Sequence, residues 1–257
     1  MIKREIVRFF KTKYFVLGCL GLIAVSVIDF FPYIPPHCDM GLIAMIYYMT
    51  RHYGLFSMVA SIFIALPCSC IVLEETSSGC YRNYMFRMGF RRYVLSRIAA
   101  ALACSMCAVC ISVFVYLAGY IVVHPKNFFL GNYIGYGKYF EDASLSVRLL
   151  FFISRFFFIG LYCCIWACVS LAACAWSNNR YIALGIGFCI ENLLSILSER
   201  LIIPLSLSPK GKMTGDVVLF SYSTPEIIVF LLIYDSFLIL LAGIIFAAGI
   251  KRRMAYV

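Results

Sequence analysis

The sequence predicts an all-α integral membrane protein with six transmembrane helices, an amphipathic interfacial helix at its N-terminus and both termini in the cytoplasm. Of the 257 residues, 63% are hydrophobic and 13% are charged, and the mean hydropathy is +0.94. A soluble domain is about half apolar and about a quarter charged. The apolar residues gather in runs long enough to cross a bilayer, and the basic residues concentrate between alternate runs. These observations exclude an ordinary soluble enzyme, a disordered chain and a nucleic-acid-binding domain.

Residues 2–13 are predicted to form an amphipathic helix that lies on the inner leaflet. Ile2, Ile6, Phe9 and Phe10 recur at helical spacing on one face, and basic residues surround the remainder. A simple positive-inside anchor accounts for the same pattern, and both interpretations stay open.

Six apolar runs follow, each near the length of about 20 residues that a membrane-spanning helix needs. The spans are expected at about 14–33, 54–73, 98–123, 149–175, 181–198 and 226–250. Pro67 removes a backbone hydrogen bond from the second run and predicts a kink there. No linker or repeat divides the chain, so residues 1–257 are predicted to form a single transmembrane helical domain.

The lysine and arginine residues predict the orientation of the chain. With the N-terminus inside, 14 of them fall on the cytoplasmic side and 7 outside, and Arg155 lies within the membrane. We therefore expect a multi-pass protein of the cell (plasma) membrane of a bacterium. Of the 13 cysteines, only Cys38 falls in an expected outer loop, so the cysteines are expected to be small packing residues. Metal ligation by clustered cysteines is the less favoured alternative, and no metal site is predicted.

The longest predicted cytoplasmic loop, residues 74–97, mixes basic residues with aromatic ones. A short helix here would place Tyr81, Tyr84, Met85 and Met88 on one face. Large apolar side chains on a charged surface usually mark a contact with another protein. An amphipathic segment resting on the inner leaflet is the alternative.

The order of residues in this loop points to a family. Glu75 and Gly79 are spaced Glu-x-x-x-Gly, a short helix is expected to follow, and Arg91, Arg92 and Arg97 lead into the third span. This arrangement resembles the loop of the permease subunits in the type-2 ATP-binding-cassette exporter family. The six spans, cytoplasmic termini, interfacial helix and small outer loops extend the resemblance over the whole chain. The chain departs from the family at Cys80, where threonine is usual, and at Met88-Gly89, where proline is usual.

The resemblance implies that residues 75–92 are a coupling helix seated in a groove of a separate ATP-binding-cassette ATPase subunit. The residues expected to couple to the ATPase are Glu75, Gly79, Tyr81, Tyr84, Met85, Met88, Arg91 and Arg92. Two permease copies, or one copy and a paralogue, would pair with two ATPases inside membrane lipid. ATP and Mg²⁺ would bind to the partner, because this chain carries no Gly-x-x-x-x-Gly-Lys-Ser/Thr motif. The chain itself is therefore expected to bind no cofactor and not to be an enzyme.

Four ionisable residues fall within the predicted spans, namely Asp29, Arg155, Glu191 and Asp235. A charge at the centre of a bilayer costs roughly 2.5–3.5 kcal/mol on insertion scales, so such residues are functional candidates. We expect Arg155 to pair with Asp235 or Glu191, either along a substrate path or as a structural ion pair.

The function predicted from these features is export or extraction of an amphipathic substrate such as an antimicrobial peptide, a drug or a lipid. The alternative is a membrane sensor or assembly module that transports nothing and docks a cytoplasmic partner through the 74–97 loop.

Overall fold

The computed structural model describes residues 2–30, 55–123, 145–200 and 225–255, and every regular element in these ranges is an α-helix. The predicted all-α class is therefore confirmed for the described residues. In chain order the helices are α1 (Ile2–Phe10), α2 (Lys13–Phe30), α4 (Leu55–Ser77), α5 (Cys80–Met88), α6 (Phe90–Val123), α8 (Leu145–Trp176), α9 (Arg180–Arg200) and α11 (Pro225–Ala255).

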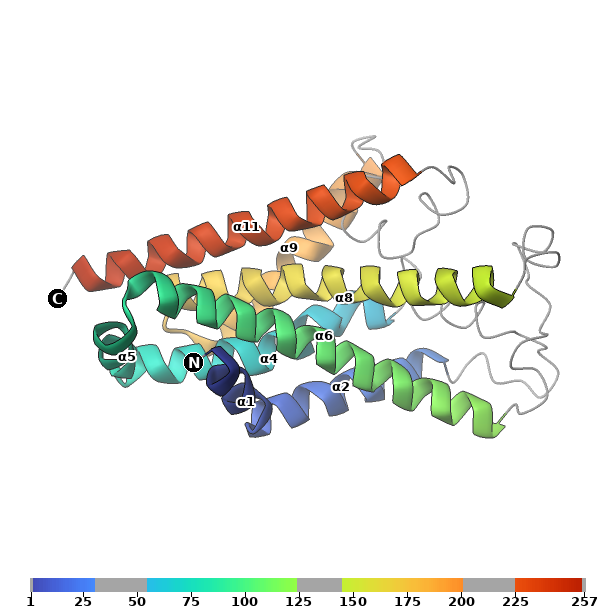
Figure 1. Cartoon of the computed structure of the whole chain (residues 1–257), viewed down its shortest axis with the longest axis horizontal. Helices are drawn as coiled ribbons and strands as arrows, with labels where there is room; N and C mark the ends of the chain where they lie inside the picture. Colours follow the sequence, from blue (N-terminus) through green and yellow to red (C-terminus); the bar gives the residue numbers. More distant parts are fainter. Residues whose placement is uncertain (1, 31–54, 124–144, 201–224, 256–257) are drawn as a thin grey trace.

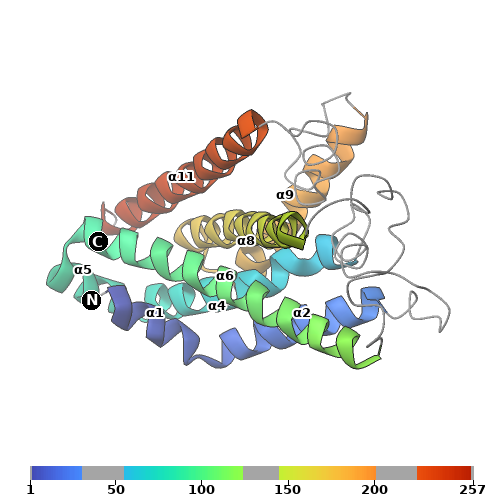
Figure 2. The same cartoon turned by 45° about the vertical axis from the view of Figure 1, so that its right-hand side comes forward.

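The long helices form a bundle around α8, which packs against α4, α6, α9 and α11 (Figure 1). On the other side of the bundle, α2 packs against α4 and α6. Figure 2 shows that α11 leans away from the rest of the bundle toward its N-terminal end. Among the apolar helices that could cross a membrane, α8 is the most buried and α11 the least.

Both described ends of the chain lie at the same end of the bundle, together with α5 (Figure 1). The short connection between α8 and α9 is also here, because α8 runs toward this end. Basic residues from α1, α5, the start of α6, the start of α9 and the end of α11 gather at this basic end. Their clustering at one end agrees with the charge pattern of the sequence, and the cytoplasmic location of that end stays a prediction.

Four of the described helices are long and apolar enough to cross a membrane, within α4, α6, α8 and α11. The α1–α2 pair makes a fifth if it counts as one span, although the two helices are bent by 58°. The helix α9 has 21 residues, which at 1.5 Å per residue is about the thickness of the hydrocarbon, yet it is not among these helices. Six spans therefore stay a prediction.

The N-terminal helix α1 forms as predicted, and its apolar face packs in part against another helix. Phe9 is completely buried and Ile6 is half-buried, because α1 packs on α6 at the basic end. Phe10 meets the ring of Phe15 edge-on at 4.8 Å between centroids. The helix thus packs against the bundle, and its location at the membrane interface stays a prediction.

The close approach of α2 to α4 depends on a glycine. A Cβ atom built on Gly18 would lie 2.7 Å from the carbonyl oxygen of Phe63 and 3.4 Å from Cδ of Pro67. Helices that lack a hydrophobic driving force in lipid use small residues of this kind to bring their backbones together. The twelve cysteines within the described residues are free, and eight of them are buried, which fits the predicted packing role.

Candidate functional site

The candidate site is the connection from α4 through α5 to α6 at the basic end of the bundle. Two glycines set the bounds of α5. Gly79 precedes it with φ 72° and ψ −1°, and Gly89 follows it with φ 78° and ψ 149°. Residues other than glycine rarely adopt either backbone conformation, so glycine is what allows two sharp turns separated by the nine residues of α5. The predicted short helix in this loop is present, and Gly79 has a structural role at its start.

One face of α5 points into the bundle and the other away from it. Tyr81 and Met85 are buried, whereas Phe86 is 91% exposed. Arg82 and Arg87 are exposed on either side of Phe86. The sequence predicted that the face of Tyr81 and Met85 would meet a partner. In the structure this face instead anchors α5 to the bundle and leaves Phe86 outside, and the contact of α5 with a partner stays a prediction.

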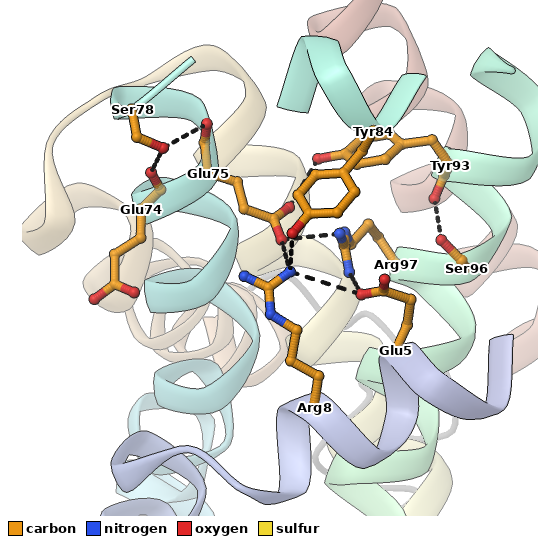
Figure 3. Close-up of polar contacts among 9 residues, drawn as sticks. All are labelled: Glu5, Arg8, Glu74, Glu75, Ser78, Tyr84, Tyr93, Ser96 and Arg97. Atoms are coloured by element: carbon orange, nitrogen blue, oxygen red, sulfur yellow. Dashed lines mark hydrogen bonds and ion pairs between the residues drawn. The ribbon is translucent and has the colours of Figure 1, made fainter. Parts of the chain in front are cut away.

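A buried carboxylate, that of Glu75, lies where α5 meets the rest of the bundle (Figure 3). Its side chain is 2% exposed. Its Oε1 atom accepts hydrogen bonds from Nη1 of Arg8 at 2.7 Å and from Nη2 of Arg97 at 2.8 Å. Its Oε2 atom accepts one from the hydroxyl of Tyr93 at 3.1 Å. Glu75 near the end of α4 is therefore bound to both α1 and α6.

Arg97 is the second centre of this cluster. Its side chain is 0% exposed, and its Nη1 atom donates a hydrogen bond to the Glu5 carboxylate on α1. The guanidinium also lies over the ring of Tyr93, at 5.0 Å from the centroid, and over that of Phe9, at 5.7 Å. A buried charge is tolerated only when it is paired and hydrogen-bonded in this way.

Tyr84 connects α5 to the same cluster. Its hydroxyl accepts a hydrogen bond from Nη1 of Arg8 at 3.1 Å, and its ring lies 5.5 Å from the guanidinium carbons of both Arg8 and Arg97. Nearby, Tyr14 of α2 donates a 2.5 Å hydrogen bond to Glu74. Residues of α1, α2, α4, α5 and α6 thus contact one another around the predicted coupling segment.

We refer to Glu5, Arg8, Glu75, Tyr84, Tyr93 and Arg97 as the basic-end cluster. Two carboxylates balance two guanidinium groups, and arginine does not give up its proton in proteins. The cluster therefore joins α1, α4, α5 and α6 through paired and hydrogen-bonded charges.

The predicted coupling residues fall into separate groups in the structure. Glu75 and Tyr84 belong to the basic-end cluster, whereas Arg91 and Arg92 are exposed at the start of α6 and Met88 is half-buried. Sequence reasoning missed the parts played by Glu5, Arg8 and Tyr93. A signal was present for Glu5, which is the one acidic residue of α1.

A hollow of about 470 Å³ opens beside Phe86. Arg82, Met85 and Phe86 of α5 line it together with Phe90 of α6 and Met254 of α11. The exposed side of α5 therefore combines an apolar surface with arginine side chains.

Of the predicted intramembrane charges, Glu191 and Asp235 are both buried. Glu191 of α9 accepts a hydrogen bond from the hydroxyl of Tyr162 on α8. The side chains of Asp29 and Arg155 lie outside the described residues, so the pairing of Arg155 with Glu191 or Asp235 stays a prediction. Within the described residues there is no group of three or more His, Cys, Asp or Glu side chains that could hold a metal ion.

Comparison of the chain with models of protein families, with curated proteins and with solved structures finds no match. The function is therefore argued from the residues and their geometry.

Proposed function

We propose that this chain is the transmembrane permease subunit of an ATP-binding-cassette transporter that exports or extracts an amphipathic substrate. In this proposal α5 is the coupling helix, and a separate cytoplasmic ATPase subunit binds it. ATP and Mg²⁺ bind to that partner, and a second permease copy or a paralogue completes the membrane part.

The observation that carries the proposal is the exposure of Phe86 on a helix whose opposite face is anchored. Burying a phenylalanine side chain is worth about 1.5–3 kcal/mol, and Phe86 is 91% exposed between Arg82 and Arg87. An exposed aromatic residue next to arginines is typical of the anchor of a protein interface. A partner surface with an apolar cleft and acidic residues around it would complement this side of α5.

The basic-end cluster supports a role in coupling, beyond docking alone. Tyr84 of α5 and Glu75 of α4 share Arg8 and Arg97 as partners, and these arginines come from α1 and α6. A displacement of α5 by a bound motor would therefore act on three further helices through short charged contacts. A loop whose purpose was only to reverse the chain would need none of these contacts, as the three-residue connection between α8 and α9 illustrates.

The buried acids support an amphipathic substrate. Glu191 and Asp235 are buried within the largely apolar middle stretches of α9 and α11, and ionisable groups in spans are costly enough to be functional candidates by default. A substrate with both polar and apolar parts would match such an interior.

The test is to replace Phe86 with serine and isolate the tagged full-length chain from the cells that naturally make it. We expect a P-loop ATPase to accompany the wild-type chain and to hydrolyse ATP in the isolated complex. Loss of the Phe86 anchor should reduce the amount of bound ATPase by about tenfold or more, as expected for a residue worth at least 1.4 kcal/mol at an interface. The measurement is quantitative mass spectrometry of the complex together with its ATPase rate.

Tyr181 offers a matched control, because it is 85% exposed at the same end of the bundle but on α9. The Tyr181→Ser variant should keep the ATPase. The proposal is wrong if no P-loop ATPase accompanies the wild-type chain, or if Phe86→Ser retains it fully. A bound cytoplasmic protein with no nucleotide hydrolysis, lost in Phe86→Ser, would instead favour the non-transporting sensor or assembly module.

A further inference from the structure

A second hollow at the basic end lies between the ends of α8 and α11. It has a volume of about 480 Å³, and its lining includes Trp176 and Asn178 as well as Arg252 and Arg253. None of the residues that line it is acidic. Two guanidinium groups, an amide and an indole therefore line the hollow and are available to a bound molecule.

Both arginines are held in place at the wall of this hollow. Arg253 donates hydrogen bonds from Nε to the carbonyl oxygen of Ala175 at 2.7 Å and from Nη2 to that of Cys174 at 3.0 Å. Its Nη1 atom donates to Oδ1 of Asn178 at 2.6 Å. The guanidinium of Arg252 lies over the indole of Trp176, 5.1 Å from the ring centroid. Little side-chain freedom remains to be lost when an anion binds here.

A separate apolar groove lies farther from the basic end along α8 and α11. It has a volume of about 150 Å³ between α8, α9 and α11, and its lining includes Trp166, Leu241 and Ile245. The indole N–H of Trp176, in the basic hollow, donates a hydrogen bond to the carbonyl oxygen of Ile245, in the groove, at 3.1 Å, so lining residues of the two hollows are in contact. Ile245 and Arg252 are seven residues apart and therefore on one face of α11, about 10 Å along its axis.

The position of the two hollows corresponds to the edge of a bilayer. The apolar stretch of α8 ends at Trp176, and that of α11 ends within the turn after Arg252 and Arg253. Tryptophan is enriched at the depth of lipid headgroups. A bilayer that covers these apolar stretches would place the basic hollow at headgroup depth and the apolar groove at the depth of the acyl chains.

We propose that this site binds one anionic phospholipid from the leaflet at the basic end. The phosphate lies against Arg252 and Arg253, and an acyl chain lies in the groove along α8, α9 and α11. Basic pockets between membrane helices recognise anionic headgroups in this way. The site goes beyond the proposed transport function and does not depend on an ATPase.

The chain's only tryptophans, Trp166 and Trp176, line the two halves of the site, which provides a direct readout. The Trp166→Phe variant of the full-length chain, placed in phosphatidylcholine nanodiscs, leaves Trp176 as the sole indole. Phosphatidylglycerol with brominated acyl chains should quench Trp176 at a lower mole fraction than brominated phosphatidylcholine does. Adding Arg252→Gln should reduce this preference by about fivefold, the effect of about 1 kcal/mol per basic residue.

Lys251 provides the matched control, because it is exposed, carries the same charge and does not line the hollow. Lys251→Gln should keep the preference for phosphatidylglycerol, and Arg252→Lys should keep most of it if charge is what matters. Equal quenching by the two lipids would overturn the proposal, as would an equal loss in Lys251→Gln and Arg252→Gln. If soluble glycerol 3-phosphate abolishes quenching by brominated phosphatidylglycerol, the hollow binds a free phosphate ester and the lipid assignment is wrong.

Discussion

At the scale of single residues, Arg97 is the side chain on which most contacts of the basic end converge. It binds Glu5 and Glu75 and lies over three aromatic rings, and it is 0% exposed. Arg8 binds Glu75 as well, but its side chain is 42% exposed. The two arginines thus form similar ion pairs in very different surroundings.

We expect Arg97→Gln to destabilise the protein by about 3–5 kcal/mol, because it removes the buried charged partner of the Glu5 and Glu75 carboxylates. Arg8→Gln should cost no more than about 1 kcal/mol, since water already screens its charge. Thermal unfolding of the detergent-solubilised protein measures both. If both variants destabilise the protein equally, burial does not decide how much each arginine contributes to its stability.

The sequence predicts some residues of the basic-end cluster but not the contacts between them. Glu75 and Arg97 were placed by their spacing in the 74–97 loop, and both are in the cluster. The contact between Glu5 and Arg97 joins residues 92 positions apart. No periodicity in one chain reports such a contact, because it depends on how α1 packs on α6.

At the scale of helices, the connection from α4 to α6 was predicted in outline. Tyr81, Tyr84, Met85 and Met88 do share a face of a short helix, as their spacing indicates. The pattern is the same whether that face points toward the bundle or away from it, so the sequence alone could not reveal that Phe86 is the exposed residue. The described α6 begins at Phe90 rather than at 98, because a helix can continue beyond its apolar run into a charged turn.

The contact between α2 and α4 gives a prediction at this scale. Gly18→Ala should destabilise the bundle by about 1–3 kcal/mol, because the added methyl group would overlap the backbone oxygen of Phe63 and push the helices apart. Gly119→Ala is the matched control, since nothing lies within 4 Å of its Cβ position. There alanine should be neutral or stabilising, by up to about 1 kcal/mol. Thermal unfolding of the two variants measures this difference. If Gly18→Ala is as stable as the wild type, α2 and α4 do not depend on a glycine at this contact.

At the scale of the whole molecule, the basic end is expected to face the cytoplasm. Cys80, the first residue of α5, is exposed there. In a Cys38→Ser background, a membrane-impermeant maleimide should label Cys80 only after the cells are permeabilised. Cys110 and Cys189 are exposed on helices expected to face lipid, where the thiolate that reacts is disfavoured.

Cys80→Ser in the same background is the control and should abolish the labelling of permeabilised cells. Labelling of intact cells through Cys80 would place α5 outside and remove the basis for a cytoplasmic motor. The fold class followed from the composition and from the lengths of the apolar runs. The orientation follows from the asymmetry of the basic residues, and the arrangement of the helices agrees with it but does not determine it.

The pairing of Glu5 with Arg97 also has a consequence for how the protein is made. The N-terminal helix leaves the ribosome first, and its arginine partner follows 92 residues later. At about 5–20 residues per second, that interval is about 5–18 s. During synthesis the nascent helix must therefore wait at the membrane surface with Glu5 in water, and it can enter the bundle only once the third apolar segment has begun to emerge. A bulky tag fused before Ile2 would hinder that late docking step even if every span inserted correctly.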